Sequence, residues 1–214
     1  MLLYAVADIH GKKGNLAKIR KNIDQYKPDI LVIAGDITNY FYPGDTIEYI
    51  STFQIPVLTV RGNSDFPTVD KLISKTSSIH SIHGKSFKEN GFHFIGMSGA
   101  LLLPFRTRVC IREKKHFRTI GSVLTDQSIL VMHPPPFGAL DRVLGRMHAG
   151  SRNIYNFIAH KQPLLFLCGH IHEDIGQVLI GKTTVVNCSL GKIGDGAIIQ
   201  LEANRMPKVD FIGC

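Results

Sequence analysis

The pattern of apolar and polar positions divides the first half of the chain into alternating strands and helices. Short apolar runs rich in Ile, Val and Leu predict three strands, over residues 2–7, 29–36 and 55–63. The amphipathic stretches that follow them predict three helices, over residues 15–26, 45–53 and 68–75. In the first of these, Leu16, Ile19 and Ile23 recur at helical spacing. Strands that alternate with helices favour parallel pairing and an α/β fold.

The second half of the chain adds hairpins to this pattern. One predicted hairpin turns at Asn90 and Gly91, and another turns at Gly181. Ser151 is the expected N-cap of a helix over residues 151–162. Further strands are predicted over residues 128–136, 163–172, 194–202 and 207–213. The least regular part of the chain runs from residue 100 to residue 121.

Together these elements predict a four-layer α-β-β-α sandwich of two mixed sheets with the helices outside. The length of 214 residues fits one domain over residues 1–214. No apolar run is long enough to span a bilayer, and the first apolar run has no basic flank before it. We therefore expect a cytoplasmic protein with no membrane partner. A homodimer is left open.

Charge and cysteine content narrow the classes of function. The net charge of +8 permits a nucleic-acid partner but does not favour one. Much of the excess lies between Phe105 and Arg118, where a solvated face is expected ahead of a phosphate-binding patch. The four cysteines show no short paired spacing, which argues against a thiolate metal site or a redox motif. Cys168 lies in an apolar run and is expected to be a buried thiol.

Side chains with metal-binding chemistry follow five of the predicted strands. They are Asp8 and His10, Asp36, Asn63, His133, and His170 and His172. Loops beyond the carboxyl ends of strands are where sites form in α/β sheets. Residues two apart on an extended segment point to the same side, so the Asp-x-His and His-x-His pairs are each expected to converge.

This donor set combines oxygen and nitrogen ligands without cysteine. Such a mixture suits divalent transition ions such as Mn, Fe, Co, Ni or Zn and argues against a closed structural zinc site. Seven donors are too many for one ion of this kind and about right for two ions that share a carboxylate. The pattern therefore predicts a dinuclear centre.

The motifs resemble those of the calcineurin-like metallophosphoesterases. They are DxHG at residues 8–11, GD at 35–36, GN at 62–63, His133 and GHxH at 169–172. Residues 148–176 resemble the small prokaryotic branch related to cyclic-nucleotide phosphodiesterases. The resemblance implies attack on phosphorus by a hydroxide or water that bridges two ions, and Mn is the ion we expect to support activity in an assay.

The resemblance also implies a role for each ligand. One ion would be held by Asp8, His10, Asp36 and His172. The second would be held by Asp36, Asn63, His133 and His170. Asp36 would therefore be shared between the two ions.

Ser64 departs from the family pattern. Many members carry at this position a histidine that assists the leaving group, and a serine is a poor proton donor. His148 is the candidate replacement, with a solvated loop as the alternative. Gly150 and Ser151 could offer N–H groups to a phosphate oxygen, and Arg146 could add a charge. A plain N-cap for Ser151 and a solvated position for Arg146 remain open.

The leading hypothesis is a dinuclear metal-dependent phosphoesterase that hydrolyses phosphodiesters, with cyclic nucleotides among the candidate substrates. Its catalytic residues would be Asp36, Asn63 and His148. One alternative is a metal-binding scaffold that holds a protein or a phosphorylated ligand with little turnover, and a weaker one is a nuclease. The complete ligand set favours the enzyme, because a scaffold would be free to lose some ligands.

Overall fold

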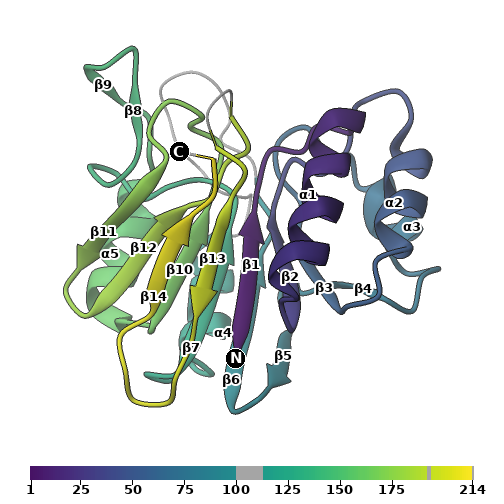
Figure 1. Cartoon of the computed structure of the whole chain (residues 1–214). Helices are drawn as coiled ribbons and strands as arrows, with labels where there is room; N and C mark the ends of the chain where they lie inside the picture. Colours follow the sequence, from purple (N-terminus) through teal and green to yellow (C-terminus); the bar gives the residue numbers. More distant parts are fainter. Residues whose placement is uncertain (100–112, 192–193, 214) are drawn as a thin grey trace.

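Two six-stranded sheets pack face to face and carry the helices on their outer faces (Figure 1). The structure is a computed structural model, and it describes residues 1–99, 113–191 and 194–213. The predicted α/β fold with two mixed sheets and a four-layer arrangement is confirmed.

The first sheet has the strand order β14-β13-β1-β2-β3-β4. Its strands β1 to β4 are parallel, and β13 and β14 extend the sheet in antiparallel fashion beside β1. The bounds are β1 Leu2–Val6, β2 Ile30–Ala34, β3 Val57–Val60, β4 Ile79–Ser81, β13 Ala197–Gln200 and β14 Lys208–Phe211. The pattern of apolar positions did not predict the three-residue strand β4.

The second sheet has the strand order β11-β12-β10-β7-β6-β5. Its central strands β12, β10, β7 and β6 are parallel, and β11 and β5 are antiparallel edge strands. The bounds are β5 Ser86–Glu89, β6 Phe92–Met97, β7 Ser128–Met132, β10 Leu165–Cys168, β11 Gly176–Ile180 and β12 Thr183–Asn187. Both predicted hairpins are confirmed, and Asn90 and Gly91 take the positive φ angles, 49° and 82°, that a tight hairpin turn requires.

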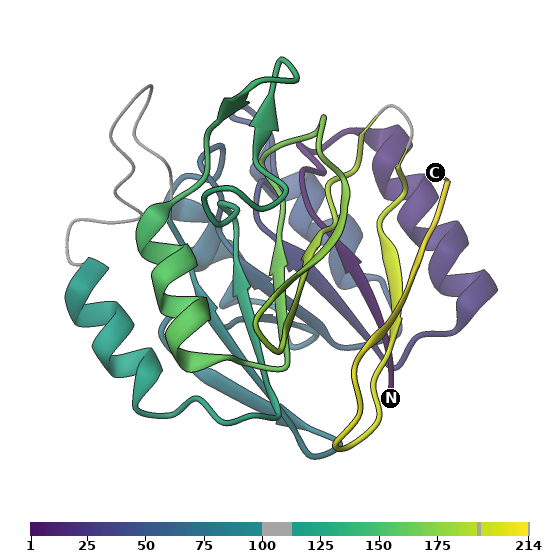
Figure 2. The same cartoon turned by 90° about the vertical axis from the view of Figure 1, so that its left-hand side faces the viewer.

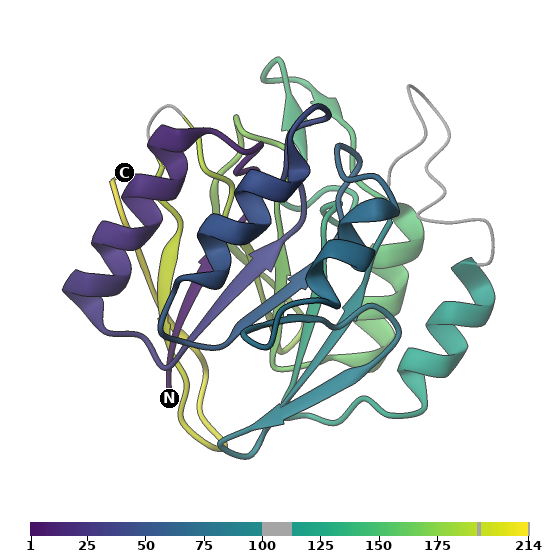
Figure 3. The same cartoon turned by 90° about the vertical axis from the view of Figure 1, so that its right-hand side faces the viewer.

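The helices divide between the two outer faces. Figure 3 shows α1 (Lys13–Tyr26), α2 (Pro43–Ser51) and α3 (Thr68–Ile73) on the first sheet. Figure 2 shows α4 (Glu113–Gly121) and α5 (Arg152–Lys161) on the second. Ser151 caps α5 as predicted, because its Oγ accepts a hydrogen bond of 3.3 Å from the Ile154 N–H.

One regional prediction is wrong in part. Residues 113–121 form the helix α4, although the stretch from 100 to 121 was expected to be irregular. The helix forms because its apolar side packs on α5: Ile120 is buried, and the rings of Phe117 and Phe157 lie 4.6 Å apart. The other part of that stretch, residues 100–112, lies outside the described residues, and so do Cys110 and Cys214.

The core between the sheets explains why the central strands read as unbroken apolar runs. All residues of β2, β7 and β10 are buried, because each strand faces the opposite sheet on one side and helices on the other. Cys168 and Cys188 are buried in these layers, and burial raises the pKa of both thiols. Among the described residues, no helix has the length and apolar content needed to cross a bilayer.

Candidate metal centre

Five strands deliver the candidate ligands to one end of the sandwich. The first sheet contributes the loops after β1, β2 and β3, and the second contributes the loops after β7 and β10. Two groups of ligand atoms form there, each with all atoms within 4.8 Å of one another. Asp8, His10 and His172 make one group, and Asp8, Asp36 and His133 make the other. The shared Asp8 lies between them.

The candidate ligand atoms come together because several ligand residues have a left-handed backbone conformation and not an extended one. The φ angles of Asp8, His10, Asp36 and His170 are 62°, 52°, 50° and 73°. The expectation that the Asp-x-His and His-x-His pairs align on extended segments is therefore wrong. The loops after β1, β2 and β10 therefore turn sharply at the candidate ligands. Positive φ is uncommon for residues other than glycine and clusters at functional sites.

Asp8 is the most enclosed of the ligands. Its Oδ1 is buried and, within the described ranges, accepts no hydrogen bond of ordinary geometry. Three imidazole nitrogens surround this atom: Nε2 of His172 at 3.1 Å, of His10 at 3.8 Å and of His133 at 3.9 Å. Burial by itself would raise the pKa of Asp8, but the contact with His172 and the charge of His133 outweigh it and lower that pKa. Asp8 is therefore a buried anion with an open coordination position.

Asp36 is held by Ser64. The Ser64 N–H donates to Oδ1 and the Ser64 hydroxyl donates to Oδ2, both at 2.8 Å. Nε2 of His133 lies 3.5 Å from Oδ2, and Nε2 of His10 lies 3.8 Å from it. Burial opposes ionisation, yet the hydrogen bonds from His133 and Ser64 lower the pKa of Asp36 well below its usual range. Ser64 thus orients the carboxylate that is predicted to bridge the ions.

His133 joins the two sheets. Its Nδ1–H donates to the Ala34 carbonyl oxygen at 2.9 Å, which turns Nε2 toward the carboxylates and to within 3.0 Å of Asn63 Oδ1. Burial disfavours the charged imidazole, but Asp36 outweighs this and raises the pKa of His133 to about 9.

His170 lies beside these groups although it belongs to neither ligand triad. Its ring centroid is 5.1 Å from that of His133, and its N–H donates to Asp8 Oδ2 at 2.9 Å. Burial lowers the pKa of His170 to about 4, so its imidazole is neutral, the form that binds metals.

Three glycines of the motifs have a packing role that the sequence alone left open. A Cβ on Gly35 would lie 2.6 Å from His133 Nδ1, and one on Gly169 would lie 2.6 Å from Asp8 Oδ2. A Cβ on Gly62 would overlap the Asp36 carboxylate. These glycines are required because a ligand side chain from another loop occupies the space of their missing side chains.

Asp65 holds two ligand loops of the first sheet together through hydrogen bonds. Its carboxylate accepts hydrogen bonds from the N–H groups of Ile37, Thr38 and Gly62 at 2.9–3.0 Å. It thereby ties the turn after β2 to the turn after β3.

Asn187 supports the second sheet's loop in the same way. Its Nδ2 donates to the carbonyl oxygens of Ile171 and Asp174, at 2.7 Å and 3.0 Å. Its Oδ1 accepts from the Ser189 N–H and hydroxyl. The loop that carries His170 and His172 is therefore fastened to the end of β12.

Two predicted phosphate-binding groups are already engaged within the protein. The Gly150 N–H donates to Asp141 Oδ2 at 2.8 Å, and the Ser151 N–H donates to the Pro135 carbonyl oxygen at 2.9 Å. Both residues are buried. The prediction that Gly150 and Ser151 bind substrate is wrong, because neither N–H is free to reach a phosphate oxygen. The alternative interpretation of Ser151 as an N-cap is the correct one.

His148 lies on a short hairpin, β8 (Arg142–Val143) and β9 (Met147–His148), which rises above the carboxyl ends of the strands (Figure 1). Its Nδ1 is 2.6 Å from Oδ1 of the fully buried Asp141, and 40% of its side chain is exposed. No pattern in the sequence indicates this pair, because a single aspartate in a loop carries no motif. Arg146 is exposed at the hairpin turn, and its role stays a prediction.

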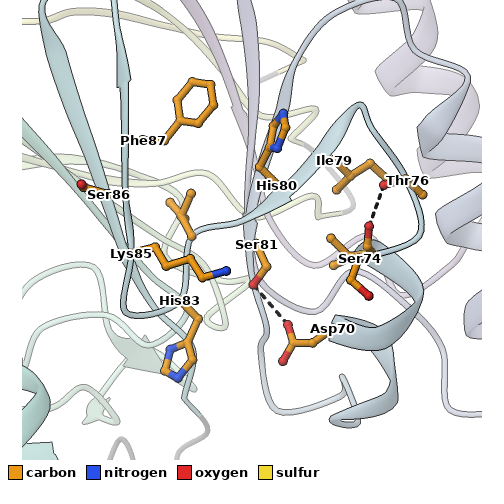
Figure 4. A pocket seen from close by; sticks show the side chains of 12 residues that line it. Asp70, Ser74, Thr76, Ile79, His80, Ser81, His83, Lys85, Ser86 and Phe87 are labelled. Atoms are coloured by element: carbon orange, nitrogen blue, oxygen red, sulfur yellow. Dashed lines mark hydrogen bonds between the residues drawn. The ribbon is translucent and has the colours of Figure 1, made fainter.

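A separate cavity of about 510 Å³ lies at the edge of the sandwich, lined by α3, β4 and β5 (Figure 4). None of the candidate ligands lines it. Asp70 in its wall accepts a hydrogen bond from Ser81 at 3.2 Å and pairs with Arg61 at 2.6 Å. Asp70 thereby connects the wall of the cavity to Arg61, which lies two residues before Asn63.

The residues present fit a pair of divalent ions. A buried carboxylate oxygen without an ordinary partner, surrounded by imidazole nitrogens, is an arrangement that a cation stabilises. Asp8, His10 and His172 could hold one ion, and Asp8 or Asp36 with His133 could hold another. The roles of Asn63 and His170 stay predictions, and both lie next to His133.

Comparisons with known proteins agree with this geometry. The uncharacterized protein MJ1162 of Methanocaldococcus jannaschii is 29% identical over 199 residues, which cover 88% of each chain. The human metallophosphoesterase domain-containing protein 1 is 42% identical over 64 residues, 29% of this chain and 20% of that protein.

Solved structures share the fold at low identity. The protein TT1561 of Thermus thermophilus superposes with a TM-score of 0.73 at 16% identity and 98% coverage of both chains. A dimetal phosphatase from Danio rerio gives a TM-score of 0.69 at 13% identity, with 100% of this chain and 96% of that one covered. The family model described as calcineurin-like phosphoesterase matches residues 1–174. The family predicted from the motifs is thereby confirmed, and this chain belongs to the calcineurin-like phosphoesterases.

Proposed function

We propose that the protein hydrolyses phosphodiesters with the help of two divalent transition-metal ions. The observation that carries this proposal is the buried, unpartnered Oδ1 of Asp8 among the imidazoles of His10, His133 and His172. A pair of ions held there would lower the pKa of a bound water and offset the charge of the phosphate oxygens. One structure of the same fold, at a TM-score of 0.58, is that of a novel archaeal phosphodiesterase, which supports the choice of substrate class.

The protein's own groups fix the ligands before any ion binds. Ser64 holds both oxygens of Asp36, and Ala34 fixes the ring of His133. Such preorganised ligands bind ions without the cost of ordering flexible side chains. Because the Ser64 hydroxyl is already donated to Asp36, it is not available to protonate a leaving group.

His148 is the group that we assign to protonate the leaving group. The buried Asp141 carboxylate fixes the ring through Nδ1, so that Nε2 is the nitrogen left to donate a proton. The hairpin is fastened to the loop of His172: the Leu144 N–H donates to Glu173 Oε2 at 2.7 Å, and the Arg142 N–H donates to Asp174 Oδ2 at 2.9 Å. These contacts keep His148 on the side of the ligand loops.

The test begins with hydrolysis by Mn-loaded protein. Bis-p-nitrophenyl phosphate, p-nitrophenyl phosphate and cyclic nucleotides are the substrates, with Asp36→Asn and His133→Ala as inactive variants. Asp24→Asn removes the same charge from an exposed position of α1 and is the matched control. We expect metal-dependent hydrolysis that is faster for the diester. No metal-dependent hydrolysis by the unchanged protein would favour the alternative, a metal-binding scaffold with little turnover.

Leaving-group dependence tests His148. His148→Gln should slow alkyl phosphodiesters by about 10²–10⁴-fold and p-nitrophenyl esters far less, because p-nitrophenolate leaves without a proton. Asp141→Asn should shift the same ratio in the same direction. Equal slowing of both ester types would show that His148 has another role.

A further inference from the structure

We propose that four exposed aromatic residues beside the metal centre form a platform on which the base of a nucleotide stacks. The residues are Tyr40, Phe41, Tyr42 and Phe66, and we call them the aromatic platform. This inference rests on the proposed function and names its substrate class: phosphodiesters of nucleotides, held by the phosphate at the metal centre and by the base on the platform.

The aromatic side chains of the platform are unusually exposed to solvent. The exposed fractions are 54% for Tyr40, 84% for Phe41, 68% for Tyr42 and 52% for Phe66. Clustered aromatic exposure of this kind marks a binding surface, whereas single exposed apolar residues carry no such meaning. The rings of Tyr40 and Phe66 meet edge to face, with centroids 5.5 Å apart, although they come from different loops.

Both loops of the platform continue directly from ligand residues. Tyr40 follows Asp36 by four residues, and Phe66 follows Asn63 by three. The chain therefore limits the Cα separations to at most about 14 Å and about 11 Å. Figure 3 shows the β2–α2 loop and the turn after β3 next to each other at the end of the sandwich where the ligands lie. Rings at such separations can reach a base whose phosphate lies at the metals.

Hydrogen bonds hold the platform in place. Asn39 Oδ1 accepts from the N–H groups of Phe41 and Tyr42, at 3.1 Å and 2.7 Å. A Cβ on Gly11 would lie 3.0 Å from Asn39 Nδ2, so the glycine that follows His10 leaves room for this loop. A platform that is fixed in advance binds its ligand without a large ordering cost.

The charge around the platform favours a base over other flat or apolar partners. Residues 37–52, which include three of the four platform residues, contain Asp45 and Glu48 and no Lys or Arg. This segment offers no cationic side chain to an anionic membrane surface or to the backbone of a long nucleic acid, and both of these bind through such side chains. A neutral heterocycle on a single nucleotide fits, since its π-face stacks on any aromatic ring.

Binding of AMP and ribose 5-phosphate to Mn-loaded protein tests the platform. The two ligands share the sugar and the phosphate and differ only in the base. Isothermal titration calorimetry should show AMP binding tighter by about 5- to 150-fold, the range expected for one stacked base. Tyr40→Ala and Phe66→Ala should bring the affinity ratio toward one, whereas Tyr40→Phe should preserve it. Tyr26→Ala, which changes a half-exposed tyrosine at the far end of α1, should leave the ratio unchanged.

Each result bears on the proposal. Equal affinities for the two ligands in the unchanged protein would overturn it, even if bis-p-nitrophenyl phosphate is hydrolysed. Base-selective binding that Phe66→Ala removes would support it, even if no diester is hydrolysed, and would then separate the platform from the proposed function. Sedimentation of the unchanged protein with phosphatidylglycerol vesicles, lost in Phe41→Ala and without any preference for AMP, would show a membrane contact instead.

Discussion

The two sheets make different contributions to the metal centre. The first sheet carries the candidate oxygen ligands Asp8, Asp36 and Asn63, which follow its strands β1, β2 and β3, and the imidazole of His10. The candidate ligands of the second sheet are all imidazoles, His133 after β7 and His170 and His172 after β10. The second sheet contributes no carboxylate to the two ligand groups, and the first contributes a single imidazole, that of His10. The centre therefore depends on how the sheets pack, as much as on the ligands themselves.

A small set of contacts joins the sheets at this end. The His133 ring donates to Ala34 of the first sheet, and the His170 N–H donates to Asp8. The Ala7 N–H donates to the Cys188 carbonyl oxygen at 3.0 Å, and the Leu190 N–H donates to the Ala7 carbonyl oxygen at 2.9 Å. Metal affinity should thus respond to changes at this junction that leave every ligand in place.

The largest effect is expected from Asp36→Asn. This substitution removes the buried charge that faces both His10 and His133. Hydrolysis should fall by about 10³-fold, and the Mn content measured by mass spectrometry should fall from two ions per chain to one or fewer. Full metal content in Asp36→Asn would show that Asp36 is not the shared ligand.

Gly169→Ala should disrupt the packing of the two sheets beside the metal centre without removing a candidate ligand. The new Cβ would overlap Ala7 and press on Asp8, because Gly169 lies against the first sheet. We expect a loss of about 1–3 kcal/mol in the free energy of unfolding, and a fall in Mn affinity of about 10- to 100-fold. Gly14→Ala in α1 is the control, since nothing lies within 4 Å of the added Cβ. Equal behaviour of the two variants in denaturant titration would contradict the prediction.

Asn187→Ala should loosen only the second sheet's loop. The side chain is fully buried and accepts or donates four hydrogen bonds, so its removal leaves polar groups without partners. The expected cost is about 1–3 kcal/mol in the free energy of unfolding, with a fall of about tenfold in Mn affinity. The exposed Gln177→Ala provides a matched control on β11. A stability loss with unchanged Mn affinity would mean that His172 keeps its place without Asn187.

Ser64→Ala should have the smallest effect of the four. The hydroxyl donor to Asp36 is lost, but the Ser64 N–H still donates to the other oxygen. We expect Mn affinity to fall by less than about tenfold, in line with a single hydrogen bond of about 1 kcal/mol. Ser74→Ala, at an exposed serine, is the control. A complete loss of metal binding would show that the hydroxyl is indispensable for orienting Asp36.

The loops that carry the candidate ligands could be predicted from the sequence because they combine two strong signals. Each follows an apolar strand, as Asp36 follows β2 and His133 follows β7, and each has a side chain with metal-binding chemistry. The helix α4 and the strands β4, β8 and β9 were missed because short or charged segments form regular structure through packing and not through their own periodicity.

The surroundings of the centre were harder to predict. The roles of Asp141 and Ser64 follow only from their hydrogen-bond partners, His148 and Asp36. These partners lie 7 and 28 residues away in the sequence. The aromatic platform had a visible signal, three consecutive aromatics before a proline at residues 40–43. Its proximity to Phe66, however, depends on the parallel pairing of β2 with β3.

The sequence by itself determined the α/β class, the positions of most strands along the chain and the chemistry of the candidate ligands, because hydrophobic periodicity and strand-end residues are local properties. Tertiary structure alone decided which N–H groups remain free, which carboxylate lacks a partner and which loops lie side by side. Gly150 and Ser151 illustrate the reason: their N–H groups suit a phosphate in sequence, yet Asp141 and Pro135 occupy them in the fold. Hydrogen-bond capacity is used up by contacts between residues distant in the chain, and only the folded arrangement shows which groups are left for a ligand.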